Sequence, residues 1–544
     1  MIRRIWRQLR RRRQRHPRDL NDASLSELQD YVKSEILTGD LKDTEEQIRA
    51  AFGNSPDLTF RYMRLGANPK VEVLIFHLDG MVDTTFVSSG IIRPIVEELP
   101  PQLATPPDGG AAYRLLRQSL IQNTGMQEAD SLEKILEYLS NGFCVILVQG
   151  VPRGLAFEAR GWAERDVGEP TTEASIRGSR ESFVENYRIN TSMLRRIIAS
   201  PQLWMEEMHI GAVTKTVITM AYVKGIAQDE LVEEVRARLQ SIEVDAIFES
   251  GYIEEYIEDA PFSPFPTVLR TERPDKAAAA LLEGRVVIIT GGTPFALVVP
   301  ATFTHFLAAS EDYYERYLTG SFIRLLRLVA LFISLTLPSF YVAVTTFHQE
   351  MLPTPLILSI AAQREGVPFA AIVEAVFLEL TFEMLREAGI RLPKVIGPAI
   401  SIVGALILGE AAVRAGLVSS AMVIVVAATA IASFASPVYS MAISVHLLRF
   451  PMVLLAGTLG LFGVFMGLSA LLIHVCSLRS FDVPYFEPLS PMIFSEWKDA
   501  LVRAPLWMMN TRPQSTVKQE YIREGPEQMP RPPRKGPKPG SDGE

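Results

Sequence analysis

The stretch "FCVILVQGVPRGLAF" at residues 143–157 has a counterpart later in the chain, "RVVIITGGTPFALVV" at residues 285–299. Each begins as an apolar, strand-like run, passes through a turn that contains glycine and proline, and continues as a second apolar run. Two long segments that share this order are typical of an internal duplication. The sequence therefore predicts two related α/β subdomains in the first part of the chain.

A further strand-like run precedes each copy. "KVEVLIFHLDGMVD" starts at Lys70, and "TKTVITMAYVKGIA" starts at Thr214 and leads into the helix-like "QDELVEEVRARLQ". We therefore expect a first α/β subdomain over residues 50–185 and a second over 186–318, after a basic arm and leading helix over 1–49. A crevice between two such halves can hold a small molecule, and the same halves can form a rigid assembly surface.

Hydropathy divides the chain near residue 320. Over its 544 residues the chain has a mean hydropathy of +0.15, which is too apolar for a purely soluble protein. The apolar runs predict a helical membrane domain over residues 319–480, with spans near 328–347, 395–413, 415–435 and 450–473. The run at 437–448 is too short to span, and we expect an interfacial helix or part of a re-entrant turn there.

The positions of the arginines predict the topology. Arg324 and Arg327 precede the first span, Arg414 lies between the second and third, and Arg479 follows the fourth. With four spans, all of these arginines fall on the cytosolic side, as do both soluble ends. Four spans are also too few for most transporter folds in one chain.

Both ends of the chain have a biased composition. The first 18 residues are rich in arginine and are expected to form either a solvated tail or a contact with anionic lipid headgroups. They are not expected to bind nucleic acid, because Trp6 is the only aromatic residue among them. Residues 481–544 are expected to form a cytosolic Pro/Gly-rich tail, and the part after Pro505 is expected to be disordered or extended.

One predicted helix in the membrane domain, over residues 368–389, carries charged side chains. At 100° per residue, one stripe holds Glu379, Glu383, Arg386 and Glu387, and another face holds Val373, Phe377, Leu380 and Met384. Glu374 lies apart from the acidic stripe. Ionisable groups in hydrocarbon are costly, so this stripe should face protein, water or the membrane surface.

Two interpretations of this helix stay open. It is either an amphipathic interfacial helix with a Glu383–Arg386 pair, or a helix that lines an aqueous path, with Glu379 and Glu383 in a cation-attracting ring and the apolar face packed on the spans. Glu410, inside the second predicted span, is likewise either a functional carboxylate or a hydrogen-bonded packing residue.

The segment between the two copies, "SIRGSRESFVENYRINTSMLRRII" at residues 175–198, has a loop-like start and a helical second half. It brings opposite charges close together: Arg177, Arg180, Glu181 and Glu185. These residues form either a solvated local network or a contact between subdomains or neighbouring subunits.

No catalytic, cofactor or metal site is expected. "VIITGGT" has neither the lysine of a phosphate-binding loop nor a dinucleotide fingerprint, so we expect a tight turn. The seven histidines form no close ligand pattern, and no spacing pairs a nucleophile with a base. An enzyme is therefore not expected. Cys144 and Cys476, in a strand and an apolar helix, are not expected to form a disulfide.

Several long motifs carry a resemblance to a known family. The run at 175–198 is similar to the R-G-P-R-E-x-F-x-E-x-x-x-x-N pattern of the GerA family of spore germinant receptor A subunits, with Ser179 in place of the usual proline. The runs at 366–394, 399–419 and 447–463 resemble that family's membrane-domain motifs. Many relatives have glutamine where this chain has Glu410.

The resemblance extends over residues 45–510 and implies a function. It implies a receptor in the spore inner membrane, built from this subunit, a multi-spanning B subunit that binds nutrient and a C-subunit lipoprotein. It also implies a homo-oligomeric ring of A subunits that releases ions to start germination. The alternatives are a scaffold or signalling subunit without a pore, and a related subunit of the dipicolinic-acid transport operon.

Overall fold

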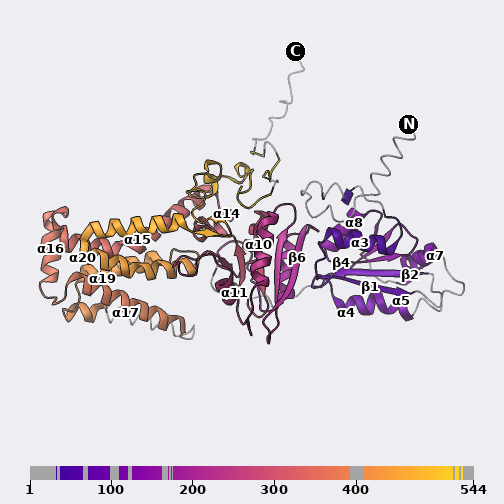
Figure 1. Cartoon of the computed structure of the whole chain (residues 1–544), viewed down its shortest axis with the longest axis horizontal. Helices are drawn as coiled ribbons and strands as arrows, with labels where there is room; N and C mark the ends of the chain where they lie inside the picture. Colours follow the sequence, from indigo (N-terminus) through magenta and orange to yellow (C-terminus); the bar gives the residue numbers. More distant parts are fainter. Residues whose placement is uncertain are drawn as a thin grey trace, which may run out of the picture.

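The computed structural model shows an elongated molecule with an α/β region at one end and a helical domain at the other (Figure 1). It describes residues 28, 32–33, 37–64, 71–97, 109–120, 125–161, 170, 173, 175–391, 409–518, 521–525 and 528–530. The arginine-rich arm at 1–18 and residues 395–408 of the second predicted span lie outside the described residues.

The first subdomain is a five-stranded sheet with helices on both faces. Its strands follow the order β1-β2-β4-β5-β3, and every neighbouring pair is antiparallel. The elements are α3 (Leu41–Ala51), β1 (Leu58–Arg64), β2 (Glu72–Leu78), α4 (Thr84–Phe86), η2 (Val87–Ile92), α5 (Arg93–Glu97), α7 (Gly109–Leu115), η3 (Leu116–Leu120), β3 (Met126–Ala129), α8 (Leu132–Ser140), β4 (Phe143–Val148) and β5 (Gly154–Glu158).

The second subdomain repeats this topology. Its strand order is β6-β7-β9-β10-β8, so each strand has a counterpart in the first sheet and the predicted duplication is confirmed. The elements are α9 (Tyr187–Ile197), β6 (Leu203–Ile210), β7 (Thr216–Val223), α10 (Asp229–Gln240), α11 (Ser250–Ile257), β8 (Leu269–Thr271), α12 (Pro274–Leu282), β9 (Val286–Thr290), β10 (Ala296–Val299), α13 (Phe303–Leu307) and α14 (Glu311–Tyr314). Helix α3 precedes β1 just as α9 precedes β6, the first strand of the second sheet. The repeat therefore begins at about residue 41 and not at 50.

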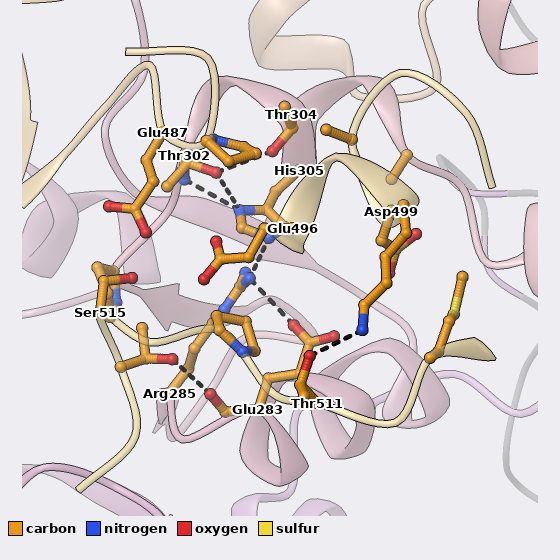
Figure 2. A pocket seen from close by; sticks show the side chains of 18 of the residues that line it. Glu283, Arg285, Thr302, Thr304, His305, Glu487, Glu496, Asp499, Thr511 and Ser515 are labelled. Atoms are coloured by element: carbon orange, nitrogen blue, oxygen red, sulfur yellow. Dashed lines mark hydrogen bonds and ion pairs between the residues drawn. The ribbon is translucent and has the colours of Figure 1, made fainter. Parts of the chain in front are cut away.

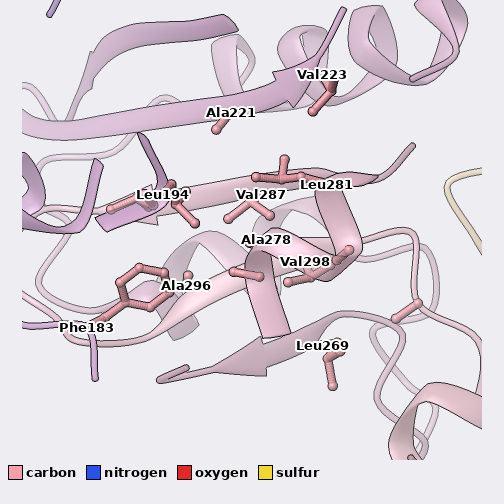
Figure 3. Close-up of a cluster of buried hydrophobic side chains, with 14 of the residues drawn as sticks. Phe183, Leu194, Ala221, Val223, Leu269, Ala278, Leu281, Val287, Ala296 and Val298 are labelled. Carbon is pink, nitrogen blue, oxygen red and sulfur yellow. The ribbon is translucent and has the colours of Figure 1, made fainter. Parts of the chain in front are cut away.

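Each sheet has a buried core on both faces. In the second subdomain, Leu194 of α9 and Leu281 of α12 pack over Val287 and Val298 of the sheet (Figure 3). The opposite face packs against α10 and α11 through Val235 and other buried residues. A three-layer arrangement follows from strands that are apolar on both faces, as the runs at 143–148 and 286–290 are.

A buried ion pair joins the two subdomains. Nε and Nη2 of Arg195 donate to the carboxylate of Asp57 at 2.7 and 3.0 Å, and Nη1 donates to the carbonyl of Leu203 at 2.7 Å. Beside it, Nε1 of Trp204 donates to the carbonyl of Ala51 at 3.1 Å. Both charged side chains of the pair are almost fully buried, so the two subdomains are held in a defined orientation.

The partly buried Glu254 of α11 gives the second subdomain a pH dependence. Burial raises the pKa of Glu254 to about 7, from an ordinary value of 4.5. A raised folded-state pKa means that this carboxyl favours folding when protonated, and the contribution is lost as the pH rises from 4.5 towards 7. We expect Glu254→Gln to increase the free energy of unfolding by about 1 kcal/mol at pH 8 and to have little effect near pH 4. Chemical unfolding at the two pH values measures this; an equal effect at both would contradict it.

The helical domain consists of α15 (Tyr317–Phe347), η4 (Gln349–Met351), α16 (Thr354–Arg364), α17 (Ala371–Arg391), α19 (Ser420–Ser433) and α20 (Tyr439–Ser477). Two of the described helices, α15 and α20, are long and apolar enough to cross a membrane by length and composition. The apolar α19, within the predicted span 415–435, has only 14 residues. Helix α17 packs against α15, α19 and α20 along the bundle.

Helix α20 turns back on itself at Gly460. This residue has φ 64° and ψ −144°, outside the helical region. A Cβ added at Gly467 would lie 2.5 Å from Sδ of Met452, whereas a straight helix would separate these positions by about 22 Å. Val438 and Val475, near the two ends of α20, also share one core cluster. The two arms of α20 are therefore antiparallel.

This turn corrects two predictions. The predicted span 450–473 is not one helix, because Gly460 divides it. Residues 439–448, expected to lie at the interface or in a re-entrant turn, instead form the first turns of the outgoing arm of α20. The sequence contains no proline or polar run at 460 to indicate the reversal, and a glycine alone is a weak signal.

We expect Gly460→Ala to destabilise the helical domain by about 1–3 kcal/mol, because its backbone conformation is almost exclusive to glycine. An added Cβ would also lie 2.7 Å from the ring of His348. Thermal unfolding of the purified full chain measures the effect. Gly366→Ala is the matched control, because a Cβ there meets nothing within 4 Å. Equal melting temperatures for the two variants would contradict the expectation.

The C-terminal segment after α20 is folded against the second subdomain. It contains β11 (Arg479–Ser480), β12 (Val483–Pro484), η5 (Phe494–Asp499) and η6 (Leu506–Met508). Tyr485 and Val517 are fully buried in the same core as α9 and α12. The prediction of a disordered or extended tail after Pro505 is therefore wrong for residues 506–518, and residues 531–544 lie outside the described residues.

Candidate functional site

The predicted charged residues at 177–185 lie on the second subdomain. Arg177 approaches Glu315 at 3.9 Å, and Glu181 accepts from Nη2 of Arg196 at 2.8 Å. Arg180 and Glu185 are exposed, and the carbonyl of Glu185 accepts from the backbone of Gly292. The segment thus lines the second subdomain, while Asp57 and Arg195 join the two subdomains. A role of the four residues in subunit contacts stays a prediction.

Glu379 and Glu383 of α17 face the interior of the bundle. Glu379, which is 2% exposed, accepts from Nη1 of Arg449 at 2.5 Å. The same guanidinium donates to the carbonyl and hydroxyl of Ser334 on α15, at 2.9 and 3.1 Å. One turn along α17, Glu383 lies 2.7 Å from Nδ1 of His446. Arg449 and Glu379 therefore connect α15, α17 and α20 through one buried polar group.

The other two candidate glutamates lie near the end of the bundle that is far from the α/β region. Glu374 is buried and accepts from both the backbone N–H and the hydroxyl of Ser419, each at 2.9 Å. It thereby holds Ser419, the N-cap residue of α19. Glu410 is exposed and pairs with Arg414 at 2.5 Å.

This arrangement corrects the expected orientation of α17. Val373, Phe377, Leu380 and Met384 are exposed, although they were expected to pack on the spans. Glu379 and Glu383 of the acidic stripe pack on the bundle instead, whereas Glu387 is exposed. The reason is that α20 supplies Arg449 and His446 as partners, which the local helical pattern does not reveal, while an apolar outer face suits lipid or another apolar surface.

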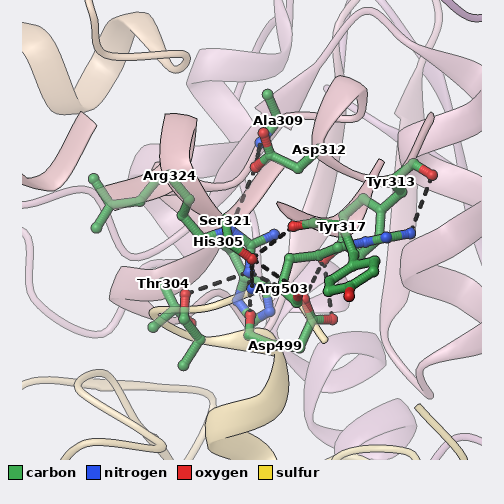
Figure 4. Close-up of polar contacts among 12 residues, drawn as sticks. Thr304, His305, Ala309, Asp312, Tyr313, Tyr317, Ser321, Arg324, Asp499 and Arg503 are labelled. Atoms are coloured by element: carbon green, nitrogen blue, oxygen red, sulfur yellow. Dashed lines mark hydrogen bonds and ion pairs between the residues drawn. The ribbon is translucent and has the colours of Figure 1, made fainter. Parts of the chain in front are cut away.

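A buried ionic cluster joins the α/β region to the first long helix. Asp312 of α14 is 2% exposed and accepts from Nη1 of Arg327 at 2.7 and 2.8 Å. It also accepts from Nε of Arg324 at 3.3 Å (Figure 4). Arg324 and Arg327 are one helical turn apart on α15 and are both buried. The close approach of α14 and α15 needs Gly320, where a Cβ would lie 2.6 Å from the carbonyl oxygen of Asp312.

The C-terminal segment completes this junction. Nη1 of Arg324 donates to the carbonyl of Asp499 at 2.6 Å and to its carboxylate at 3.1 Å. The hydroxyl of Tyr313 also donates to the Asp499 carboxylate, at 2.9 Å. Three separate parts of the chain, α14, α15 and η5, therefore meet at one set of buried charges. We call Asp312, Tyr313, Arg324, Arg327 and Asp499 the junction cluster.

A cavity of about 100 Å³ adjoins the junction cluster, between the second subdomain and the C-terminal segment (Figure 2). Ionisable groups line it: Glu283, Arg285, His305, Glu487, Glu496, Lys498, Asp499 and Arg523. Burial lowers the pKa of His305 well below its usual value and raises the pKa values of Glu487 and Glu496. A cavity lined by such groups can hold a small polar molecule.

Comparison with known proteins identifies the family. The family described as Bacillus/Clostridium GerA spore germination protein matches residues 46–515. The chain belongs to the GerA family. It is 44% identical to spore germination protein KA of Bacillus subtilis (strain 168) over 92% of this chain and 90% of that protein. It is 42% identical to an uncharacterized membrane protein, YfkQ, of the same organism, over 90% of this chain and 93% of that protein.

A solved structure is also similar to this GerA chain. It is the N-terminal domain of the A subunit of the Bacillus megaterium spore germinant receptor GerK3, with 34% sequence identity. The match covers 49% of this chain and 98% of that domain, with a TM-score of 0.39.

The sequence did not reveal the junction cluster or the cavity of this GerA protein. Arg324 and Arg327 were interpreted only as charges that orient the first span. Their spacing of three residues, just before an apolar run, is also what two guanidiniums need to share one carboxylate. Asp499 of the junction cluster and one side of the cavity come from residues 481–525, which were assigned to the predicted tail. No local signal linked these residues to α15.

Proposed function

We propose that this chain is the A subunit of a nutrient-responsive germinant receptor in the spore inner membrane. It acts with a multi-spanning B subunit that binds nutrient and with a C-subunit lipoprotein. Its helical domain is embedded in the membrane as a multi-span bundle, and the α/β region and both termini face the cytosol. Copies of the subunit assemble into a ring that opens to release ions and starts germination.

The single observation that carries this proposal is the course of α15. The helix begins in the junction cluster beside the α/β region and runs to the far end of the helical domain (Figure 1). Because buried ion pairs fix its first turns to α14 and η5, a displacement of the α/β region has to move α15 as well. Membership of the GerA family and the two long apolar helices support the membrane location.

The placement of the glutamates affects where ions would cross. Glu379 and Glu383 are paired inside the bundle of a single chain, so the path lies between copies and not through one bundle. The exposed Glu410 is then the carboxylate that attracts cations to the path. The exposed residues Arg180 and Glu185 are candidates for contacts between copies.

A sized, reconstituted complex tests the proposal. The full chain is purified with its B and C partners, its oligomeric state is measured, and cation flux is recorded in vesicles. A symmetric ring of A subunits that conducts cations is expected, with Glu410→Gln lowering cation preference several-fold. Glu365→Gln, another exposed carboxylate of the helical domain, is the matched control and should leave flux unchanged. A monomeric A subunit without flux would overturn the channel.

The internal pairing of Glu374, Glu379 and Glu383 also favours a second candidate, a scaffold or signalling subunit without a pore. In that case these carboxylates only hold the helices together. The related subunit of a dipicolinic-acid transport system is the other form of this candidate. Two results would favour the scaffold over the channel: a cation flux that Glu410→Gln leaves unchanged, or a complex in which a single A subunit binds B.

A further inference from the structure

The charged cavity beside the junction cluster has features of a binding site for a small molecule. It lies between β9, α13 and the C-terminal segment, and the described residues that line it come from three separate stretches of sequence. About 100 Å³ is room for several water-sized groups, since a cavity of roughly 10–15 Å³ can hold one water molecule. The cavity therefore suits a ligand of at most roughly seven to ten non-hydrogen atoms.

One side of the cavity presents hydrogen-bond donors that lack an acceptor. The backbone N–H of Thr302 donates to Nδ1 of His305 at 3.0 Å, so neutral His305 carries its proton on Nε2. Nε2 faces Nη2 of Arg285, which donates to the carboxylate of Glu283 at 3.1 Å and cannot accept a hydrogen bond from His305. Nε of Arg285, a residue that is 2% exposed, has no partner among the atoms that the structure describes. Buried donors are normally satisfied, so this side of the cavity calls for an anionic acceptor.

The other side of the cavity is acidic. Glu487 is buried, and Glu496 accepts from the backbone N–H of Gln514 at 2.9 Å. Burial raises the pKa of each of these carboxyl groups, which an adjacent cation would counteract. A purely anionic ligand would meet repulsion here, and a purely cationic ligand would leave Nε of Arg285 and Nε2 of His305 without an acceptor.

We propose that this cavity binds a small zwitterion, with its carboxylate on Arg285 and His305 and its ammonium group on Glu487 and Glu496. The proposal is independent of the receptor function proposed above, because it rests only on the groups that line the cavity.

The position of the cavity gives such a ligand a route to the helical domain. Asp499 lines the cavity and also accepts hydrogen bonds from Arg324 of α15 and from Tyr313. A ligand that orders η5 would stabilise the junction cluster, so the ligand and the orientation of α15 are thermodynamically linked.

Calorimetric titration of the purified full chain tests the proposal. Glycine is the zwitterionic probe, and acetate, methylammonium and inorganic phosphate are the single-charge probes. Ala308→Leu fills the cavity without removing a polar group, and Arg285→Lys removes the unpaired Nε while keeping the charge. Ala237→Leu, on the exposed face of α10, is the matched control. Thermal unfolding of each variant checks that it is folded.

The expected result is saturable binding of glycine, at least tenfold weaker binding of each single-charge probe, and at least a tenfold loss of glycine affinity in Ala308→Leu and Arg285→Lys. The control should bind as the unmodified chain does. Three results would overturn the proposal: no saturable binding of glycine to the folded chain, glycine binding that a folded Ala308→Leu leaves unchanged, or tighter binding of acetate, methylammonium or phosphate than of glycine. If Arg285→Lys does not fold, Ala308→Leu alone decides.

Discussion

Replacing Arg449 by methionine is expected to lower the free energy of unfolding of the helical domain by about 3–5 kcal/mol. Arg449 is 1% exposed and pairs with Glu379, which is 2% exposed. Without the guanidinium, the Glu379 carboxylate would remain in an apolar bundle with no opposite charge. The bonds to Ser334 on α15 would be lost at the same time. Thermal unfolding of the detergent-purified full chain measures the change.

A second substitution separates this explanation from a simple packing defect. The double variant Arg449→Met/Glu379→Leu removes both charges, so it is expected to recover most of the lost stability. Arg414→Met is the matched control, because that arginine is exposed, and its pair with Glu410 is worth about 0–1 kcal/mol. If Arg449→Met and Arg414→Met have the same melting temperature, the buried pair of Arg449 and Glu379 does not stabilise the bundle.

The α/β half of the fold was visible in the sequence because its signal is local. Strands buried on both faces are continuous apolar runs, and the duplication repeats those runs in the same order. The start of the repeat at α3 was missed, since its polar face dominates the composition of residues 41–51. The predicted loop followed by a helix at 175–198 is confirmed by α9, which Asn186 caps.

The helical domain and the site depend on contacts between distant residues. The acidic stripe of α17 was recognised, but its direction depends on Arg449, which lies 70 residues further along the chain. The fold of residues 481–518 depends on a few apolar side chains, such as Tyr485 and Val517, that enter the core of the second subdomain. Composition averages over such residues, so it predicted a tail where the junction cluster and the cavity are built.

Replacing Asp312 by asparagine is expected to destabilise the junction cluster by about 3–5 kcal/mol, because it leaves two buried guanidiniums without their shared carboxylate. Arg324 keeps its bonds to Asp499, whereas Arg327 loses its only described ion pair. The loss should therefore appear mainly where α14 meets α15. Thermal unfolding measures its size, and limited proteolysis between residues 308 and 320 locates it.

A double variant that also removes the unpaired charge tests whether the junction cluster couples α14 to α15 or only stabilises the fold. Asp312→Asn/Arg327→Met takes away the unpaired cation, so stability is expected to return while the link between α14 and α15 remains weakened. If α15 transmits changes from the α/β region to the membrane, this double variant should be folded but give much less ion flux in the reconstituted complex. Asp482→Asn, at an exposed pair with Arg479, is the control and should change neither quantity. A stable double variant with full flux would mean that the junction cluster holds the domains together without coupling them.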